Sequence, residues 1–380
     1  MIYFDNNATT PIAPEAAAAI VDVLENDYGN PSSAHTMGRR ARDIVEAARS
    51  SVAGLIGANS PDEIVFTSGG TESDNFAILG ALRASPEKRH IVTTRVEHEA
   101  VRKLAERLET DGFEVTWIDV DEYGALDVDA FRYAIRPDTA VVSAMLANNE
   151  TGVIFPMAEL AAIVKDRSSA MFHVDGVNAA GKMPIALGQT AVDLFSISAH
   201  KFNGPKGAGA LYIRDGVKIP SMYVGGGQES GRRAGTEPMH QIAGMGAAAK
   251  LAIEVLPLSA TAKLRETLEN GILQKIPNSR LNGTKDTALR LPNTSNVSLK
   301  DTNGEMIMAI LDKAGVCVST GSACNSENHM ASAVLQAMNV PYSWAMGSIR
   351  FSLGRYNTAA EVDKVLTILP NIVADLRAMG

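Results

Sequence analysis

Cysteine is scarce in this sequence, with only Cys317 and Cys324 among 380 residues. Two cysteines make neither a disulfide framework nor a CxxC metal pair, so we expect no metal site and a reducing, cytoplasmic setting. No segment approaches the roughly 18 uninterrupted apolar residues that a membrane helix needs. The opening residues, MIYFDNNATTP, also lack the basic and apolar regions of a secretory signal. We therefore expect no membrane association.

Positive charge is also in short supply. Lysine and arginine total 35 against 43 aspartates and glutamates, which gives a net charge of −8. A direct nucleic-acid partner is not expected, because such proteins normally carry a basic patch. Hydrophobic residues make up 46% and charged residues 21%, as in a folded globular protein with a sizeable core.

From about residue 60, short β-branched runs alternate with amphipathic stretches of helical period. The runs predict strands at Glu63–Thr67, His90–Arg95, Glu114–Val120, Ala140–Leu146, Met171–Val174, Leu194–Ser198 and Ala208–Ile213. The stretches predict helices that include Thr71–Leu82, His98–Thr110, Asp127–Ile135 and Met157–Lys165. Successive strand–helix units indicate an α/β fold, with a mostly parallel central sheet flanked by helices.

A different pattern follows a helix expected at about 240–255 and Pro257. It predicts helices at 261–276, 303–315 and 358–378, and strands at 295–299, 316–320 and 348–353. We therefore predict a large domain over residues 14–257 and a smaller α+β domain over residues 258–380, which the N-terminal segment 1–13 joins.

The segment SISAHKFNGPKG places Ser198, His200 and Lys201 at the end of an apolar strand, before a Gly/Pro loop. A lysine there can form a Schiff base with an aldehyde cofactor when its pKa is depressed, while a hydroxyl and an imidazole hold a phosphate. A lone His-Lys pair is more often a surface feature. Lys206 is the other candidate for the cofactor lysine in this segment. The turn that contains it is expected to direct its side chain outward, which favours Lys201.

A second segment, FTSGGTESDN, runs from a strand through Gly70 into a helix that Thr71 opens. Free backbone N–H groups at a helix start, with a threonine hydroxyl beside them, suit a phosphate. Taken alone, such a turn is equally a common helix cap. The segment lacks the GK[ST] ending of a nucleotide-binding P-loop.

A third segment, FHVDGVNAAGK, ends a strand with Asp175. A buried carboxylate needs a cationic or hydrogen-bonding partner, and the protonated pyridine nitrogen of pyridoxal phosphate (PLP) is one. Alone, this aspartate could equally cap the next turn. Lysine, phosphate loop and aspartate all follow strands, where ligands of parallel sheets bind, so together they predict a PLP site.

Two further polar residues follow predicted strands of the same sheet. His98 could stack on the cofactor ring and shuttle protons, and Asn149 could donate to its phenolate oxygen. Each also has a plain structural interpretation, as a core histidine and as a turn residue.

The two cysteines lie in different contexts. Cys317 lies in the apolar alternating run GVCVST, which predicts a strand in which the thiol packs as a small hydrophobe. Cys324 follows Gly321-Ser322-Ala323 and precedes polar residues, which predicts an accessible loop where a thiolate can form.

Ten segments then occur in one order along nearly the whole chain: DNNATTP (5–11), GNPSSAH (29–35), FTSGGTESDN (66–75), EH (97–98), NNETG (148–152), HVDGVNAAGK (173–182), SAHKFNGPKG (198–207), GGGQESGRRAGTE (225–237), STGSAC (319–324) and IRFSLGRYNT (349–358). In this respect the chain resembles the NifS/IscS-type cysteine desulfurases, which are fold-type I PLP enzymes of the class-V aminotransferase group. The resemblance implies removal of sulfur from L-cysteine to give alanine and a persulfide, for iron–sulfur cluster or other thio-cofactor assembly.

The resemblance also implies roles for particular residues. Lys201 would carry the cofactor and Asp175 would pair with its pyridinium, and Cys324 would accept the sulfur. Arg350 would bind the substrate carboxylate, and Asn149 would also contact the substrate. The remaining cofactor contacts would come from Gly70, Thr71, His98, Asn149, Asn178, Ser198 and His200, with Thr236 supplied by the second subunit of a homodimer. The expected partners are L-cysteine and a sulfur-acceptor or iron–sulfur scaffold protein.

The sequence departs from the family pattern at several positions. Relatives usually carry glutamine where Asn178 stands, and Glu327 and Ala333 replace a glycine and a histidine. A selenocysteine lyase of the same PLP group is the nearest alternative, and Cys324 argues against it because release of selenide needs no protein thiol. A scaffold without turnover is a further alternative, against which the intact Lys201, Asp175 and Arg350 argue.

Overall fold

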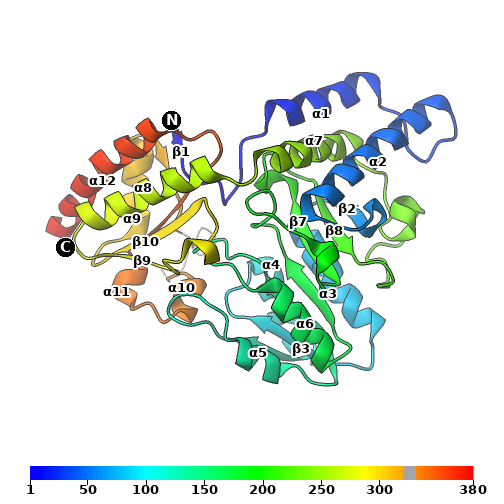
Figure 1. Cartoon of the computed structure of the whole chain (residues 1–380), viewed down its shortest axis with the longest axis horizontal. Coiled ribbons are helices and arrows are strands. Elements are labelled where there is room, and N and C mark those ends of the chain that lie inside the picture. Colours follow the sequence, from blue (N-terminus) through cyan, green and yellow to red (C-terminus); the bar gives the residue numbers. More distant parts are fainter. Residues whose placement is uncertain (321–330, 380) are drawn as a thin grey trace.

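The computed structural model describes residues 1–320 and 331–379 and shows a larger and a smaller lobe (Figure 1). The larger lobe is built on a seven-stranded sheet in the order β2-β8-β7-β6-β5-β3-β4. Its strands are β2 (Ile64–Thr67), β3 (His90–Thr94), β4 (Glu114–Ile118), β5 (Thr139–Met145), β6 (Met171–Asp175), β7 (Leu194–Ser198) and β8 (Gly209–Ile213). Only β8 runs antiparallel to its neighbours in this sheet, which confirms the predicted mostly parallel sheet.

Helices cover both faces of this sheet. Side chains alternate between the two faces along each strand, so that Ile64 and Phe66 join one hydrophobic cluster and Val65 joins another. The first cluster is covered by α1 (Pro14–Asn26), α2 (Thr36–Ile56), α5 (Val128–Ala134), α6 (Met157–Arg167) and α7 (Met239–Val255). The second is covered by α3 (Gly70–Ala84) and α4 (Glu99–Thr110). A sheet buried on both faces explains the apolar runs of the sequence.

Several predicted element ends shift by one or two residues. Glu63, predicted to start a strand, lies instead in a 3-10 turn, where its carboxylate accepts the backbone N–H groups of Asn59 and Ser60. In the described part of the chain, the 3-10 segments are η1 (Pro61–Glu63), η2 (Leu187–Gln189), η3 (Ala199–Lys201), η4 (Gln228–Gly231) and η5 (Thr287–Leu289).

The smaller lobe contains a three-stranded antiparallel sheet and a two-stranded parallel one. The strands are β9 (Ser279–Leu281), β10 (Thr294–Leu299) and β12 (Ser348–Ser352) in the first, and β1 (Ile2–Tyr3) and β11 (Val316–Cys317) in the second. The helices after α7 are α8 (Ser259–Lys275), α9 (Gly304–Lys313), α10 (Ala333–Ala337), α11 (Tyr342–Ala345) and α12 (Ala359–Met379). The predicted strand 316–320 is wrong beyond Cys317, because its partner β1 ends at Tyr3 and Ser319 pairs with Arg350 instead.

A separate hydrophobic cluster holds this lobe together. Ile2 and Phe4 pack there with side chains from α8, α9, α12 and the strands, and both chain ends lie in this lobe (Figure 1). The segment after β1 runs from this cluster to the large sheet. Asn6 and Asn7 form hydrogen bonds with Ser352 of the smaller lobe, and Thr10 forms one with His200 after β7 of the large sheet. The domain boundary near residue 257 stays a prediction.

One property of the helices bears on membranes. Within residues 1–320 and 331–379, no single helix has the length and apolar character to cross a bilayer. Only α7 and α8 taken together would have them, and that pair is bent by 75°.

Candidate active site

Six strands of the large sheet run in one direction and end at the same edge, and a pocket of about 240 Å³ lies there. It is lined by Ala8, Gly70, Thr71, Asp74, His98, Met145, Ala147, Asn149, Asp175, Val177, Asn178, Ser198, His200 and Lys201. This edge is where ligands of parallel α/β sheets bind. The cofactor residues expected from the sequence therefore meet in one place, with the exception of Thr236.

Lys201 enters the pocket from η3, directly after β7. Its Nζ donates to the backbone carbonyls of Asn7 at 2.5 Å and Ala8 at 3.1 Å. Burial and, to a smaller extent, the nearby Arg350 guanidinium lower the pKa of Lys201 to about 8. Lys206 is exposed and borders only the wider, open mouth of the pocket. Lys201 is therefore the amine best suited to covalent chemistry in the pocket.

Asp175 ends β6 and is 6% exposed. Its Oδ1 accepts the backbone N–H of Val177 at 2.9 Å. Burial and, to a smaller extent, the neighbouring Asp74 raise the pKa of this carboxyl to about 6, and His98 partly opposes them. A cation in the pocket beside Asp175 would stabilise the carboxylate and reverse this shift.

One side of the pocket is suited to an anion. Gly70 and Thr71 open α3, whose first backbone N–H groups have no partner within the helix. Ser198 and His200 lie against this turn, and all four residues also line the open mouth. Burial lowers the pKa of His200 to about 4, so its imidazole is neutral at physiological pH and can donate one hydrogen bond. Together these groups can hold a phosphate.

His98 and Asn149 follow β3 and β5 at the same edge. His98 caps α4, where its Nδ1 accepts the N–H of Ala100 at 3.2 Å, so the neutral ring carries its proton on Nε2. The backbone carbonyl of Asn149 accepts from Asn7 Nδ2 at 3.0 Å and from Arg350 Nη1 at 3.1 Å. Arg350, on β12 of the smaller lobe, is thereby held beside the pocket.

Two buried acids near Asp175 were not expected from the sequence. Asp74 lines the pocket and Glu97 directly precedes His98, and burial raises their pKa values to about 7 and about 8. His173 Nε2 lies 3.5 Å from Asp74 Oδ1, but burial lowers the pKa of His173 to about 4. The imidazole is therefore neutral at physiological pH and does not form an ion pair with Asp74.

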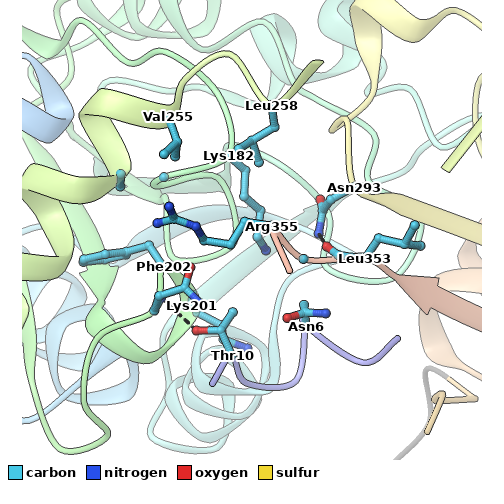
Figure 2. A pocket seen from close by; sticks show the side chains of 14 residues that line it. Asn6, Thr10, Lys182, Lys201, Phe202, Val255, Leu258, Asn293, Leu353 and Arg355 are labelled. Carbon is cyan, nitrogen blue, oxygen red and sulfur yellow. Dashed lines mark hydrogen bonds between the residues drawn. The ribbon is translucent and has the colours of Figure 1, made fainter. Parts of the chain in front are cut away.

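A polar network extends behind Lys201. Lys182 Nζ donates to Asn178 Oδ1 at 2.7 Å and to Asn7 Oδ1 at 2.9 Å. Asn178 Nδ2 donates to the backbone carbonyl of Asn148 at 3.2 Å. A smaller pocket of about 40 Å³ also borders Lys201 and is lined in addition by Lys182 and Arg355 (Figure 2).

Comparison with known proteins places this site in a family. Residues 2–365 match the family described as aminotransferase class-V. A cysteine desulfurase of Cereibacter sphaeroides is 50% identical over 380 residues, which cover 100% of this chain and 97% of that protein. The cysteine desulfurase NifS of Azotobacter vinelandii is 44% identical over 378 residues, which cover 99% and 93%. The chain belongs to the cysteine desulfurases of this family.

Solved structures agree with the membership in the cysteine desulfurase family. A structure described as a NifS-like protein has a TM-score of 0.92 at 38% identity and covers 99% of this chain and 100% of its own. A structure described as SspA in complex with cysteine has a TM-score of 0.82 at 32% identity and covers 94% and 100%. The predicted fold is confirmed by these likenesses.

Two residues singled out in the sequence, Thr236 and Cys317, do not line the pocket. Thr236 is exposed and does not line it. Cys324 falls outside the described residues 1–320 and 331–379. Cys317 lies in β11, where burial raises the pKa of its thiol, with Asp312 and Asp5 adding to the effect.

The sequence carries a signal for Asp74 and Lys182, although neither stands among the expected site residues. Asp74 shares a helix face with Ala77 and Ile78, which are buried, so an acid stands among apolar positions. Lys182 follows Ala179, Ala180 and Gly181, three small residues without polar side chains, whereas exposed turns usually contain polar residues. A charged residue on a buried face is often functional.

Proposed function

We propose that the pocket binds PLP and that this cysteine desulfurase transfers sulfur from L-cysteine to Cys324, leaving L-alanine. The observation that carries the proposal is the meeting of Lys201, Asp175 and the Gly70–Thr71 turn in one pocket. Each of the three has an ordinary structural interpretation alone, but an amine, a buried carboxyl and an anion cradle in one place match the three ends of this cofactor.

The described residues fit PLP in their chemistry. Asp175 is a buried carboxyl whose pKa is raised by burial, and a pyridinium nitrogen beside it would stabilise the carboxylate. The depressed pKa of Lys201 makes its amine available to bond an aldehyde carbon. Gly70, Thr71 and the neutral His200 offer hydrogen-bond donors to a phosphate.

Arg350 is suited to the carboxylate of the substrate. Its side chain is 6% exposed, and its Nε has no hydrogen-bond partner within the described part of the chain. A buried, unsatisfied donor of a guanidinium is costly unless an acceptor arrives. An amino-acid carboxylate beside Asn149 would supply it, with the bidentate geometry that arginine favours.

The reaction then divides among residues of this chain. Bound PLP withdraws electrons from the Cα of an attached amino acid. Lys201, released by the substrate amine, accepts the Cα proton. The Cys324 thiolate attacks the substrate sulfur, so an S–S bond forms while Cβ–Sγ breaks, and the electron pair stays on Cβ and takes up a proton. L-Cysteine and one thiol thus become L-alanine and one persulfide, with no external oxidant.

The wider setting completes the proposal. The persulfide would pass to a sulfur-acceptor or iron–sulfur scaffold protein in the cytoplasm, where two cysteines can stay reduced. A homodimer would complete the site, with the exposed Thr236 of one subunit reaching the phosphate of the other. A selenocysteine lyase is not favoured, because the relatives compared above carry the name cysteine desulfurase.

Borohydride reduction tests the cofactor assignment. The purified protein should be yellow and should form alanine and sulfide from cysteine in the presence of a reductant. Reduction should fix the cofactor covalently on Lys201, which peptide mapping will show. The exposed Lys206 is the matched control, so that Lys206→Gln should retain the yellow colour and the labelled peptide. A cofactor found on Lys206, or no alanine, would refute the proposal.

A further inference from the structure

Lys182 is almost fully buried, which is rare for a lysine. Its side chain is 5% exposed, in the turn that follows β6. Gly181 before it has a φ of +73°, and a Cβ there would come within 2.5 Å of the Phe202 Cβ, so the turn is pressed against the residue next to Lys201. The local backbone therefore holds Lys182 close to the pocket lysine, and both side chains line the smaller pocket in Figure 2.

Among residues 1–320 and 331–379, no carboxylate acts on the Lys182 amine. Burial lowers the pKa of Lys182 well below the ordinary value, and the positive charges of Lys201 and Arg350 contribute to the same shift. The oxygens that accept from its Nζ belong to two neutral amides, those of Asn7 and Asn178. Burial of an amine without a carboxylate is costly, so its retention calls for a function that an apolar residue of similar length cannot perform.

Both amides have a fixed polarity. Asn178 Nδ2 donates to the carbonyl of Asn148, and Asn7 Nδ2 donates to the carbonyl of Asn149. A backbone carbonyl accepts only, so each amide must turn its oxygen the other way, toward Lys182. An amide nitrogen carries two protons, and Asn178 uses one of them on Asn148. Since Asn178 lines the pocket, its second N–H is available to an acceptor there.

Asn7 connects Lys182 to Lys201 through two hydrogen bonds. Its backbone carbonyl accepts from Lys201 Nζ at 2.5 Å, while its side-chain oxygen accepts from Lys182 at 2.9 Å. Asn7 is 1% exposed and is also held by Asn293 and Thr294. Lys182 thus holds Asn178, which lines the pocket, and Asn7, which binds the pocket lysine Lys201.

We propose that Lys182 is a positioning residue that holds Asn178 and Asn7 by their side-chain oxygens, so that Asn178 presents an N–H to the ring oxygen of the cofactor and Asn7 presents its carbonyl to Lys201. The inference rests on the proposed function, because it takes the acceptor in the pocket to be PLP. It explains how an asparagine, which is shorter than glutamine, is fixed in a defined orientation at this position.

The test measures the cofactor by absorbance rather than by turnover. Lys182→Met keeps the length of the side chain and removes its donors. Loss of a donor to the ring oxygen makes the oxygen anion less stable, so the pH midpoint of the visible absorbance change should rise by about one unit. Asn178→Ala should cause a similar rise, and the double variant should show no more than either single one, because both act through one hydrogen bond.

Lys88→Met is the matched control, since Lys88 also donates to two neutral oxygens, of Thr139 and Ser169, away from the pocket. It should leave the midpoint unchanged. If Lys182→Met lowers the melting temperature and leaves the midpoint at the wild-type value, Lys182 only stabilises the fold and the proposal is wrong.

If Lys182→Met does not fold, Asn178→Ala decides, because an unshifted midpoint there excludes Asn178 as a donor to the cofactor. A wild-type protein that binds no PLP would overturn the proposed function together with this inference. A normal wild-type spectrum with unshifted variants overturns the inference alone.

Discussion

Arg350 Nη2 donates to Asp5 Oδ1 at 2.7 Å, although 345 residues separate the two along the chain. Arg350 lies on β12, and Asp5 follows β1 in the N-terminal segment. The guanidinium side chain is 6% exposed and the carboxylate 19%. The ion pair therefore joins both ends of the sequence beside the pocket and holds a buried cation where the substrate carboxylate is expected.

Asp5→Asn tests the importance of this pair. Removal of the carboxylate leaves the Arg350 guanidinium buried with a neutral partner, so the free energy of unfolding should fall by about 1–3 kcal/mol. The KM for cysteine should rise severalfold, because the guanidinium is no longer held in one orientation. Chemical denaturation and steady-state kinetics measure the two effects.

Asp119→Asn is the control, because it removes the carboxylate of an ion pair of the same length at the surface. Asp119 pairs with Arg95 at the same 2.7 Å, but the two side chains are 72% and 52% exposed. Such a pair contributes less than about 1 kcal/mol. Equal effects of the two substitutions would contradict the role given to Asp5.

Asp175→Asn should separate charge from packing at the pyridine end of the site. Asparagine keeps the size of the side chain and can still accept the N–H of Val177, but it offers no anion to hold the pyridinium proton. Turnover should fall by about two or more orders of magnitude while PLP remains bound. Near-normal turnover of this variant, with cofactor content verified by absorbance, would rule out the pyridinium pairing.

Glu97 predicts a pH dependence of stability. Its pKa in the folded protein is about 8, above the ordinary value of 4.5, because the carboxyl is buried. Between these values the folded state binds more protons than the unfolded chain, so this group costs stability as the pH rises from about 4.5 to 8. Glu97→Gln removes that cost, and its oxygen can still accept from Thr94 and Met145.

Urea denaturation at pH 5 and pH 9 measures the effect. The Glu97→Gln variant should match the wild type at pH 5 and exceed its free energy of unfolding by at least about 1 kcal/mol at pH 9. The exposed Glu122→Gln should change neither value. A variant that loses stability equally at both pH values would show that the Glu97 carboxyl is not held protonated.

The proposed shared site predicts a homodimer. Thr236 is exposed in the single chain, so a role at the phosphate requires a second subunit. Thr236→Ala should weaken PLP retention by about 1 kcal/mol, the value of one neutral hydrogen bond. Light scattering that shows a fully active monomer would contradict this arrangement.

The sequence predicted the parts of the site that follow strong local patterns. Lys201, Asp175 and Thr71 each follow an apolar strand in a sheet whose parallel strands share one carboxyl edge, so their meeting could be inferred from order alone. The sheet itself was predictable because strands buried on both faces leave long apolar runs.

Contacts between distant segments were not predictable in the same way. The strand 316–320 was overestimated because its partner β1 has only two residues, which no local pattern reveals. The links of Lys182 to Asn7 and of Arg350 to Asp5 join segments 175 and 345 residues apart. Such pairs depend on how the lobes pack, whereas periodicity reports only on neighbours along the chain.

The two cysteines are expected to differ in reactivity. Cys317 is fixed in β11, where burial raises the pKa of its thiol, so little thiolate forms at neutral pH. Sequence context predicts an accessible thiol at Cys324. Cys324→Ser should therefore bind cysteine and show its early spectral change, yet release almost no sulfide in a reducing assay. Cys317→Ser should lose some stability and keep the chemistry.

Mass spectrometry locates the sulfur directly. After treatment with cysteine in the absence of reductant, the wild-type peptide that contains Cys324 should gain about 32 Da, the mass of one added sulfur atom in a persulfide. Cys317→Ser should show the same adduct on the same peptide, since the thiol in β11 takes no part. We expect the transfer to end on Cys324, because the accepting sulfur has to meet the substrate and then reach an external acceptor, which Cys317, held in β11, cannot do. An adduct on Cys317, or normal turnover by Cys324→Ser, would refute the proposed sulfur transfer.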